Sequence, residues 1–228
     1  MIPPSDLIQP RSLEGVLFDF GRVLSGPPNP AAWAHMRELT AFEEEALHRG
    51  YWAHRHAYDE GKHTGEEYWH LVAADNGTVF TAEQVTALLA ADNALWTDPN
   101  LPMIDWALRL HRSGIRIGIL SNMGDAMKEG VLASFDWINE FDHHTWSHML
   151  GIAKPAEAIY RHAAEGLGVA PGKILFIDDR PENIEAARAF GMHAIQYGDH
   201  AEFLREMEAQ GFGSLLQPER RKIAVQRK

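Results

Sequence analysis

The 228-residue sequence contains no cysteine, and none of its apolar runs approaches the roughly 20 residues that a membrane-spanning helix requires. The missing cysteine excludes disulfide bonds, thiolate metal sites and cysteine nucleophiles. Basic residues are scarce as well: 21 Lys and Arg against 32 Asp and Glu give a formal net charge of −11, which argues against general nucleic-acid binding. We therefore expect a protein that binds neither nucleic acid nor membrane.

The start of the sequence lacks the features of a secretory signal. The first 15 residues contain no basic n-region and no apolar h-region, so we expect no secretory signal and a cytoplasmic protein. The only basic cluster lies near the other end, and we expect residues 214–228 to form a flexible, solvated tail. An oligomer contact or a membrane-surface contact is the alternative for this tail. The sequence is compatible with a monomer or a homodimer.

What the sequence does contain is a set of short apolar runs that end in polar or acidic residues. These are Val16–Phe18 before Asp19, residues 115–120 before Ser121 and Asn122, and Ile174–Ile177 before the pair Asp178 and Asp179. Continuous apolar runs of this length are typical of parallel strands covered by helices on both faces. The carboxyl ends of such strands meet in the crevice where open α/β sheets bind ligands. An aspartate there can be a nucleophile or a ligand of a hard cation such as Mg²⁺, although a single one is often only a turn former or helix cap.

The remaining pattern predicts a split α/β fold. Residues 14–28 and 99–213 alternate between strand and helix patterns, which predicts a Rossmann-like, doubly wound parallel sheet. Residues 29–98 show no convincing strand, and we expect them to form an inserted helical cap subdomain. Three capping-box signals support helices there: Thr40 with Glu43, Thr64 with Glu67, and Thr81 with Gln84.

Four segments in this order resemble the signature segments of the haloacid dehalogenase superfamily, most of whose members are phosphatases. They are FDFGRVL at 18–24, ILSNM at 119–123, GIAKPAEAIY at 151–160 and FIDDRPENIEAAR at 176–188. The amino-acid sequences of these segments are most similar to the subgroup that includes the N-terminal phosphatase domain of soluble epoxide hydrolases and bacterial sugar-phosphate phosphatases. The resemblance implies a helical cap that closes over the site, and a Mg²⁺-dependent phosphatase of a small phosphorylated metabolite that forms an aspartyl-phosphate intermediate.

The resemblance also implies a role for each motif residue. Asp19 is expected to be the nucleophile, and Lys154 to pair with both the phosphate and the nucleophile. Ser121 and the Asn122 amide are expected to bind phosphoryl oxygens. The expected magnesium ligands are Asp19, Asp178, Asp179 and the main-chain carbonyl of Gly21. Asn183 is expected to orient the site, although a polar residue in a first helical turn needs no such role.

Gly21 departs from the family pattern, because most phosphatases of the superfamily have a second aspartate there as general acid and base. General acid–base assistance is worth roughly 10²–10⁴-fold in rate. Either the substrate has a good leaving group, or water or a cap residue carries the proton, or the protein binds a phosphorylated ligand with little turnover. Dehalogenation is the other enzymatic alternative. It uses the same aspartate without metal, but true dehalogenases of the family lack the acidic pair of the last motif.

Weaker candidates come from the expected cap and from the first loop. Tyr51, Trp52, Arg55 and His56 combine aromatic and cationic groups suited to a phosphorylated sugar, and we expect them to face the pocket. As core residues of a small helical subdomain they would need no function. Arg22, beside the nucleophile, could contact phosphate or point to solvent.

Overall fold

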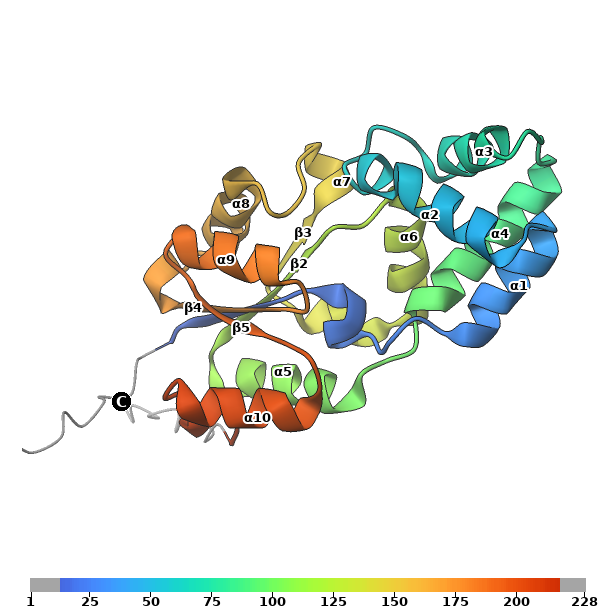
Figure 1. Cartoon of the computed structure of the whole chain (residues 1–228). Helices are drawn as coiled ribbons and strands as arrows, with labels where there is room; N and C mark the ends of the chain where they lie inside the picture. The colour runs from blue at the N-terminus through green and yellow to red at the C-terminus, as the bar shows by residue number, and fades with distance from the viewer. Residues whose placement is uncertain (1–12, 218–228) are drawn as a thin grey trace, which may run out of the picture.

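The computed structural model of the protein describes residues 13–217, which form a single five-stranded parallel sheet with helices on both faces (Figure 1). The strands lie in the order β3-β2-β1-β4-β5, with bounds Gly15–Phe18 (β1), Arg116–Ser121 (β2), His143–Trp146 (β3), Ile174–Asp178 (β4) and His193–Gln196 (β5). This arrangement confirms the α/β, doubly wound fold that the apolar runs predict.

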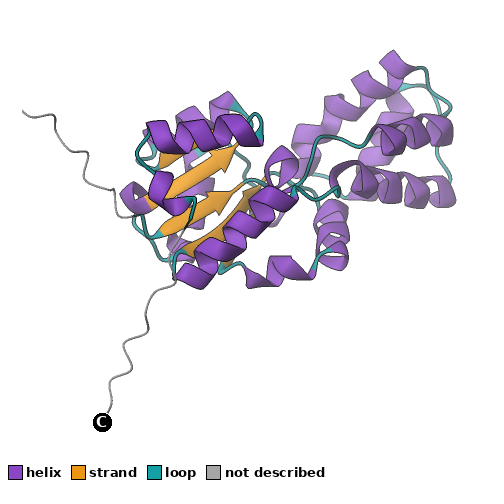
Figure 2. Ribbon diagram, turned by 90° about the horizontal axis from the view of Figure 1, so that it is seen from below, coloured by secondary structure: helices purple, strands orange, loops and turns teal. Residues whose placement is uncertain are grey.

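The strands are apolar throughout because helices cover both faces of the sheet. All residues of β1 and β4 are buried. One face packs against α5 (Leu101–Ser113), α6 (Asp125–Ser134) and α10 (His200–Ala209), and the other against α8 (Glu157–Leu167) and α9 (Pro181–Ala189), as Figures 1 and 2 show. Short helical turns complete the connections: η1 (Phe20–Leu24), η2 (Asp136–Glu140), α7 (Ser147–Leu150), η3 (Pro171–Lys173) and η4 (Gly213–Leu215).

Four α-helices make up most of the segment between η1 and α5. They are α1 (Pro30–Thr40), α2 (Glu44–Asp59), α3 (Gly65–Asp75) and α4 (Ala82–Trp96), which we call the helical insertion. In Figure 1 these helices lie together beside the sheet, at the end where α6 and α7 are found. The insertion has its own core, in which the largest buried side chains are the aromatic rings of Tyr51, Tyr58, Tyr68 and Trp69.

The helix starts of the insertion follow two of the three capping-box signals. Thr64 and Thr81 form complete capping boxes at the starts of α3 and α4. The prediction for Thr40 was wrong, because Thr40 ends α1 and its hydroxyl donates to the Met36 carbonyl, 2.9 Å away. The Thr40 hydroxyl oxygen accepts from the Phe42 amide over 3.3 Å, but α2 begins three residues later, after Glu43, without a side-chain cap.

The beginning of the expected basic tail is packed rather than free. The indole nitrogen of Trp106 on α5 donates to the Leu215 carbonyl over 2.8 Å, and Leu215 and Leu216 pack against the main core. The tail boundary at residue 214 was therefore wrong for its first residues, and residues 218–228 lie outside the described part of the chain. None of the helices within residues 13–217 has both the length and the apolar character needed to cross a bilayer.

The insertion packs against the core at Gly124, where the absence of a side chain leaves room for an aromatic ring. A Cβ atom at Gly124, just before α6, would lie 2.1 Å from Cζ of Tyr58 on α2. Nearby, the Gly65 amide at the start of α3 donates to Asp125 Oδ1 over 3.0 Å. The insertion is therefore seated against the start of α6 as well as joined to the core by its two connecting segments.

We predict that Gly124→Ala destabilises this contact, because the new methyl group occupies space that the Tyr58 ring fills. Overpacking of this kind costs about 1–3 kcal/mol, and each kcal/mol lowers Tm by about 2–4 °C in a domain of this size. Thermal unfolding measures the effect. Gly172→Ala is the control, because its nearest neighbour would lie 3.9 Å from the new Cβ. Equal Tm values for the two variants would contradict the predicted contact.

Candidate active site

The carboxyl ends of β1, β2 and β4 meet at one edge of the sheet. The Asp19 amide donates to the Ile177 carbonyl over 2.8 Å, which places the end of β1 beside the end of β4. Ser121 and Asp178 are the last residues of β2 and β4. In the strand order, β2 and β3 lie on one side of β1, and β4 and β5 lie on the other. The edge beside β1 is therefore the switch point where α/β sheets bind ligands.

A cavity of about 330 Å³ opens at this edge, between the sheet and the helical insertion. Its volume falls at the small end of the roughly 300–1,000 Å³ found for ligand pockets. Most of the residues selected from the sequence line it: Asp19, Gly21, Arg22, Trp52, Arg55, His56, Ser121, Asn122, Lys154, Asp179 and Asn183. The motifs therefore converge on one space, which is suited to a small ligand.

Asp19 is held by the turn that follows β1. One carboxylate oxygen, Oδ1, accepts from the Phe20 amide over 2.7 Å and from Lys154 Nζ over 2.9 Å. The Ser25 amide closes the turn by donating to the Phe20 carbonyl over 2.8 Å. Among the described residues, no hydrogen-bond donor is directed at the second oxygen, Oδ2. Asp19 is thus fixed through one oxygen and has the other available for chemistry.

The Lys154 side chain joins three strand ends. Its ammonium group donates to Asp19 Oδ1 (2.9 Å), to Asp178 Oδ2 (2.7 Å) and to the Leu120 carbonyl (3.0 Å). Burial alone would lower the pKa of Lys154, but the charges of Asp178 and Asp19 outweigh that effect and raise it. The ammonium group is therefore permanently charged inside the cavity wall.

Asn122 places the loop that carries Lys154. Its side-chain oxygen accepts from the Lys154 amide over 2.8 Å, and its side-chain nitrogen donates to the Lys154 carbonyl over 3.0 Å. This two-way contact occupies the side-chain amide, so a phosphoryl oxygen would be bound by the main-chain N–H of Asn122. Ser121, which is almost fully buried, lines the cavity beside it.

Asp178 lies beneath the cavity floor, and Asn183, which lines the cavity, contacts it. The Asn183 side-chain amide donates to both Asp178 oxygens, over 2.9 and 3.0 Å, and the Arg180 amide donates to Oδ1 over 2.8 Å. Both Asp178 oxygens are thus saturated, and Asp178 does not line the cavity. Its observed contacts orient Lys154, and Asn183 in turn orients Asp178.

Three carboxylates gather where β1 and β4 end. Oxygens of Asp19, Asp178 and Asp179 all lie within 4.8 Å of one another. Burial raises the pKa of Asp19 to about 7; Lys154 opposes this shift, and the charges of Asp178 and Asp179 add to it. A cluster of hard oxygen ligands fits a divalent cation such as Mg²⁺.

The two residues that follow Phe20 differ in backbone strain. Gly21 has φ −62° and ψ 126°, which any residue can adopt, and a Cβ atom there would meet nothing within 4 Å. Arg22 has φ 60°, in the left-handed region, and its Nε lies 3.2 Å from Asp179 Oδ2. The missing side chain at position 21 therefore leaves open space, and the guanidinium of Arg22 rests against the acidic cluster.

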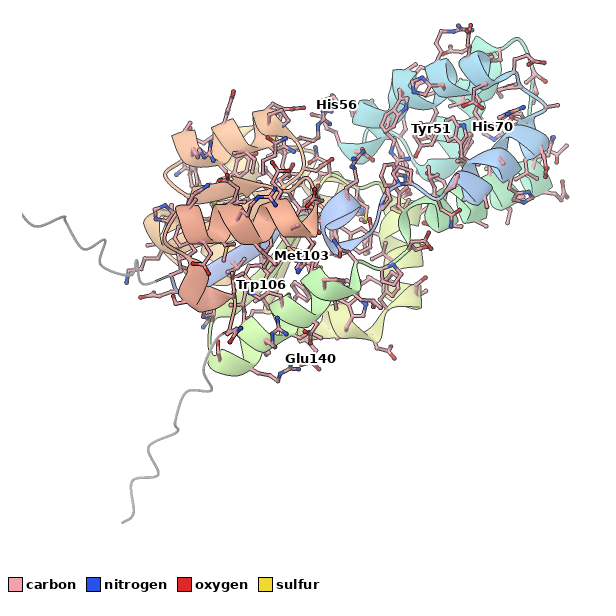
Figure 3. The ribbon with its side chains drawn as sticks, turned by 60° about the horizontal axis from the view of Figure 1, so that its bottom comes forward. Tyr51, His56, His70, Met103, Trp106 and Glu140 are labelled. Atoms are coloured by element: carbon pink, nitrogen blue, oxygen red, sulfur yellow. The ribbon has the colours of Figure 1, made fainter. Side chains whose placement is uncertain are left out.

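The insertion contributes part of the cavity wall. Trp52, Arg55 and His56 line it as predicted, whereas Tyr51 does not. Tyr51 is fully buried, and its hydroxyl donates to Asp92 Oδ1 over 2.7 Å. In Figure 3, His56 lies toward the core while Tyr51 lies within the helical insertion. The prediction for Tyr51 was wrong because its ring fills the insertion core.

Several lining residues were missed at the level of sequence: Phe20, Asp59, Trp96, Met123, Met127 and Arg180. Asp59 is the only carboxylate that the insertion contributes to the cavity within residues 13–217. Its Oδ1 lies 3.1 Å from Nε of Arg55, four residues earlier on α2. The spacing of four residues after a candidate pocket arginine is the signal that could have identified it.

The protein thus has a doubly wound α/β fold, in which an aspartate and a lysine lie at the switch point of the parallel sheet. The model for haloacid dehalogenase-like hydrolases matches residues 15–191, and the chain belongs to this family.

Three known proteins illustrate the similarity. Bifunctional epoxide hydrolase 2 of Sus scrofa is 28% identical over 230 residues, which cover 90% of this chain but only 40% of the relative. The chain thus spans less than half the length of this curated relative. The HAD family enzyme bt-2542 of Bacteroides thetaiotaomicron has a TM-score of 0.72 at 20% identity, covering 86% of this chain and 98% of that one. The L-2-haloacid dehalogenase of Xanthobacter autotrophicus has a TM-score of 0.61 at 16% identity, covering 92% and 90%.

We predict that Asp19→Asn stabilises the metal-free protein at about pH 8. An acid whose pKa is raised on folding stabilises the fold at low pH, and this contribution is lost as the pH rises through the folded pKa. Since that pKa is about 7 for Asp19, the wild type at about pH 8 retains an unfavourable buried charge that asparagine removes. The expected gain in Tm is at least about 3 °C, the equivalent of roughly 1 kcal/mol.

Thermal unfolding in a chelator at several pH values measures this difference, which should shrink below about pH 6 as Asp19 becomes protonated. Asp105→Asn is the control, because Asp105 is exposed and pairs with Arg109 on the surface of α5. A variant that is no more stable than the wild type at about pH 8 contradicts the prediction.

Proposed function

We propose that the protein is a Mg²⁺-dependent phosphatase that hydrolyses a small phosphorylated metabolite, such as a sugar phosphate, through an aspartyl-phosphate intermediate. The observation that carries this proposal is the meeting of Asp19, Lys154 and the acidic pair Asp178–Asp179 around one small cavity. A carboxylate nucleophile attacking a phosphate must overcome the repulsion between two anions. A buried lysine and a cation-binding cluster beside the nucleophile supply the compensating charge.

In the first half-reaction, Asp19 Oδ2 attacks phosphorus and the bond to the leaving oxygen breaks. Lys154 holds Asp19 Oδ1, so that the free oxygen is presented to the cavity. Ser121 and the main-chain amide of Asn122 bind phosphoryl oxygens. In the second half-reaction, water attacks the phosphorus of the acyl phosphate and Asp19 is released. Two easier displacements replace one difficult displacement.

Asp19 and Asp179, with the Gly21 carbonyl, would hold the magnesium ion, and Asp178 would join them only by exchanging one of its hydrogen bonds for the ion. When bound, the cation neutralises the excess negative charge of the cluster and of the incoming phosphate. Arg22 already rests against Asp179 and is placed to contact the phosphate or the acidic cluster.

We further propose that residues 29–98 act as a cap over a core of residues 14–28 and 99–213. Trp52, Arg55 and His56 of the insertion face the cavity opposite the strand ends. A lid of this kind excludes water and contacts the non-reacting part of the substrate, while the sheet holds the reacting groups. The two tryptophans of the wall, Trp52 and Trp96, offer an aromatic surface for a sugar ring.

The structural neighbour bt-2542 supports the phosphatase proposal, because it has been crystallised in complex with magnesium and inorganic phosphate. The dehalogenase neighbour keeps the alternative of attack on carbon under consideration. The three clustered carboxylates argue against it, since they suit a divalent cation, which the dehalogenase reaction does not need.

The first test is hydrolysis of p-nitrophenyl phosphate with and without Mg²⁺. We expect activity that requires the metal and that falls by at least about 10³-fold in Asp19→Asn, because the nucleophile is lost. Activity without metal on a 2-haloacid would favour the dehalogenase. Absence of phosphatase activity with any divalent metal would favour a protein that only binds a phosphorylated ligand.

A second prediction concerns the missing aspartate. We expect Gly21→Asp to raise the turnover of alkyl phosphates about tenfold or more, because an acid beside the nucleophile assists poor leaving groups. The backbone conformation and the open space at Gly21 accommodate the side chain. Steady-state kinetics on glycerol phosphate measures the effect, with p-nitrophenyl phosphate as the comparison substrate. Unchanged or lower rates on glycerol phosphate would contradict this account of position 21.

A further inference from the structure

The glycine at position 21 leaves the proposed reaction without a proton donor on the sheet. Lys154 donates to three acceptors already, and Asp178 is saturated beneath the cavity. Among the lining residues of the described chain outside the acidic cluster, two are of the types that serve as general acids in enzymes, Asp59 and His56, both on α2. The donor has to come from the insertion.

Hydrogen bonds place Asp59 close to the loop that binds the phosphate. The Ser147 hydroxyl, at the start of α7, donates to the Asp59 main-chain carbonyl. The same hydroxyl accepts from the Met123 amide over 2.8 Å, and Met123 directly follows Asn122. Asp59 is therefore two hydrogen bonds away from the phosphate-binding loop, and its side chain enters the cavity from the insertion.

The charges around Asp59 favour a retained proton. The Arg55 guanidinium is shared between two carboxylates: Nη1 contacts both oxygens of Asp92, at 3.1 and 2.9 Å, and Nε contacts Asp59 Oδ1 at 3.1 Å. Burial raises the pKa of Asp59 to about 6; Arg55 opposes this shift, and the charge of Asp92 adds to it. Of the two carboxylates that share Arg55, Asp92 is deeply buried and only Asp59 lines the cavity.

The titratable and charged groups that face this carboxyl come from several elements. They are Arg55, His56 and Tyr58 on α2, Tyr68 on α3, Asp92 on α4, and, across the cavity, Asp19, Arg22, Lys154, Asp179 and Arg180.

We propose that Asp59 is the general acid and base of the phosphatase reaction, in the place of the aspartate that position 21 lacks. This inference rests on the proposed phosphatase function. As the bond from Asp19 to phosphorus forms, the bond from phosphorus to the leaving oxygen breaks and that oxygen takes the proton of the Asp59 carboxyl. In the second half, the attacking water gives a proton to the Asp59 carboxylate, and Asp19 and inorganic phosphate are released.

The contacts of the two candidates favour Asp59 over His56. Arg55 fixes one Asp59 oxygen, while no donor among the described residues contacts the other, which can carry the proton. The His56 side chain is 69% exposed, and its Nε2 pairs with Glu60 at 3.4 Å on the outside of the helix. A general acid must be held within hydrogen-bonding distance of the leaving oxygen. Of the two, Asp59 is the one held by a buried partner at the cavity, Arg55.

The test compares Asp59→Asn with the wild type on a poor and a good leaving group. Asparagine keeps the size of the side chain and an acceptor for Arg55 but has no acidic proton. We expect turnover of glycerol phosphate to fall at least about 30-fold more than that of p-nitrophenyl phosphate, whose leaving group needs no proton. Adding Gly21→Asp to Asp59→Asn should restore most of the lost glycerol phosphate turnover, because the acid returns to the position that other family members use.

The control is Asp75→Asn, which removes a carboxylate of the insertion that pairs with His54 away from the cavity. It should change neither rate. An equal loss on both substrates in Asp59→Asn, without rescue by Gly21→Asp, assigns Asp59 a structural role and overturns the inference while the phosphatase function stands. A selective loss in His56→Gln in place of Asp59→Asn also overturns it. A wild type without activity on either substrate overturns both proposals.

Discussion

The active edge of this protein depends on one buried ammonium group. Lys154 Nζ donates to acceptors at the ends of β1, β2 and β4, namely Asp19, the Leu120 carbonyl and Asp178. Three loops that are distant in sequence are thereby fixed relative to one another. Removing Lys154 itself would leave two buried carboxylates without a partner, and a loss of this kind typically costs about 3–5 kcal/mol. The same contacts that hold the edge together also aim Asp19.

This arrangement concentrates three carboxylates at one place in the cavity wall. Lys154, Arg22 and Arg180 are the cations beside them. In the folded chain, burial and the neighbouring carboxylates nevertheless make the charged form of Asp19 unfavourable. In the proposed function, a cation bound at the cluster would relieve that cost, so that part of the cost of the metal-free site would contribute to binding the metal.

The strand ends were predictable from sequence because parallel strands in register bring their carboxyl ends together, whatever the connecting segments do. The helical insertion was predictable as a set of helices, but the position of each residue along them was not. Tyr51, Arg55 and Asp59 follow one another every four residues on one face of α2. At about 1.5 Å per residue, that face runs about 12 Å from the insertion core to the cavity. The pattern indicates the face, whereas tertiary packing decides that Tyr51 is buried and Asp59 reaches the site. The prediction that Thr40 starts a helix was also wrong, because Thr40 is the last residue of α1 and its hydroxyl donates to the turn before it.

The proposed proton donor belongs to the insertion and not to the sheet. An aspartate at position 21 would move with the sheet and would be present in every state of the protein. Asp59 instead belongs to α2, and its carbonyl accepts a hydrogen bond from Ser147 of the core. The Tyr58 ring beside it packs against Gly124 at the start of α6. In the proposed reaction, Asp19 and Asp59 would therefore act as a pair only when the insertion is seated on the core. Departure of the leaving group would then be coupled to that arrangement, in which the insertion limits the access of bulk water to the proposed acyl phosphate.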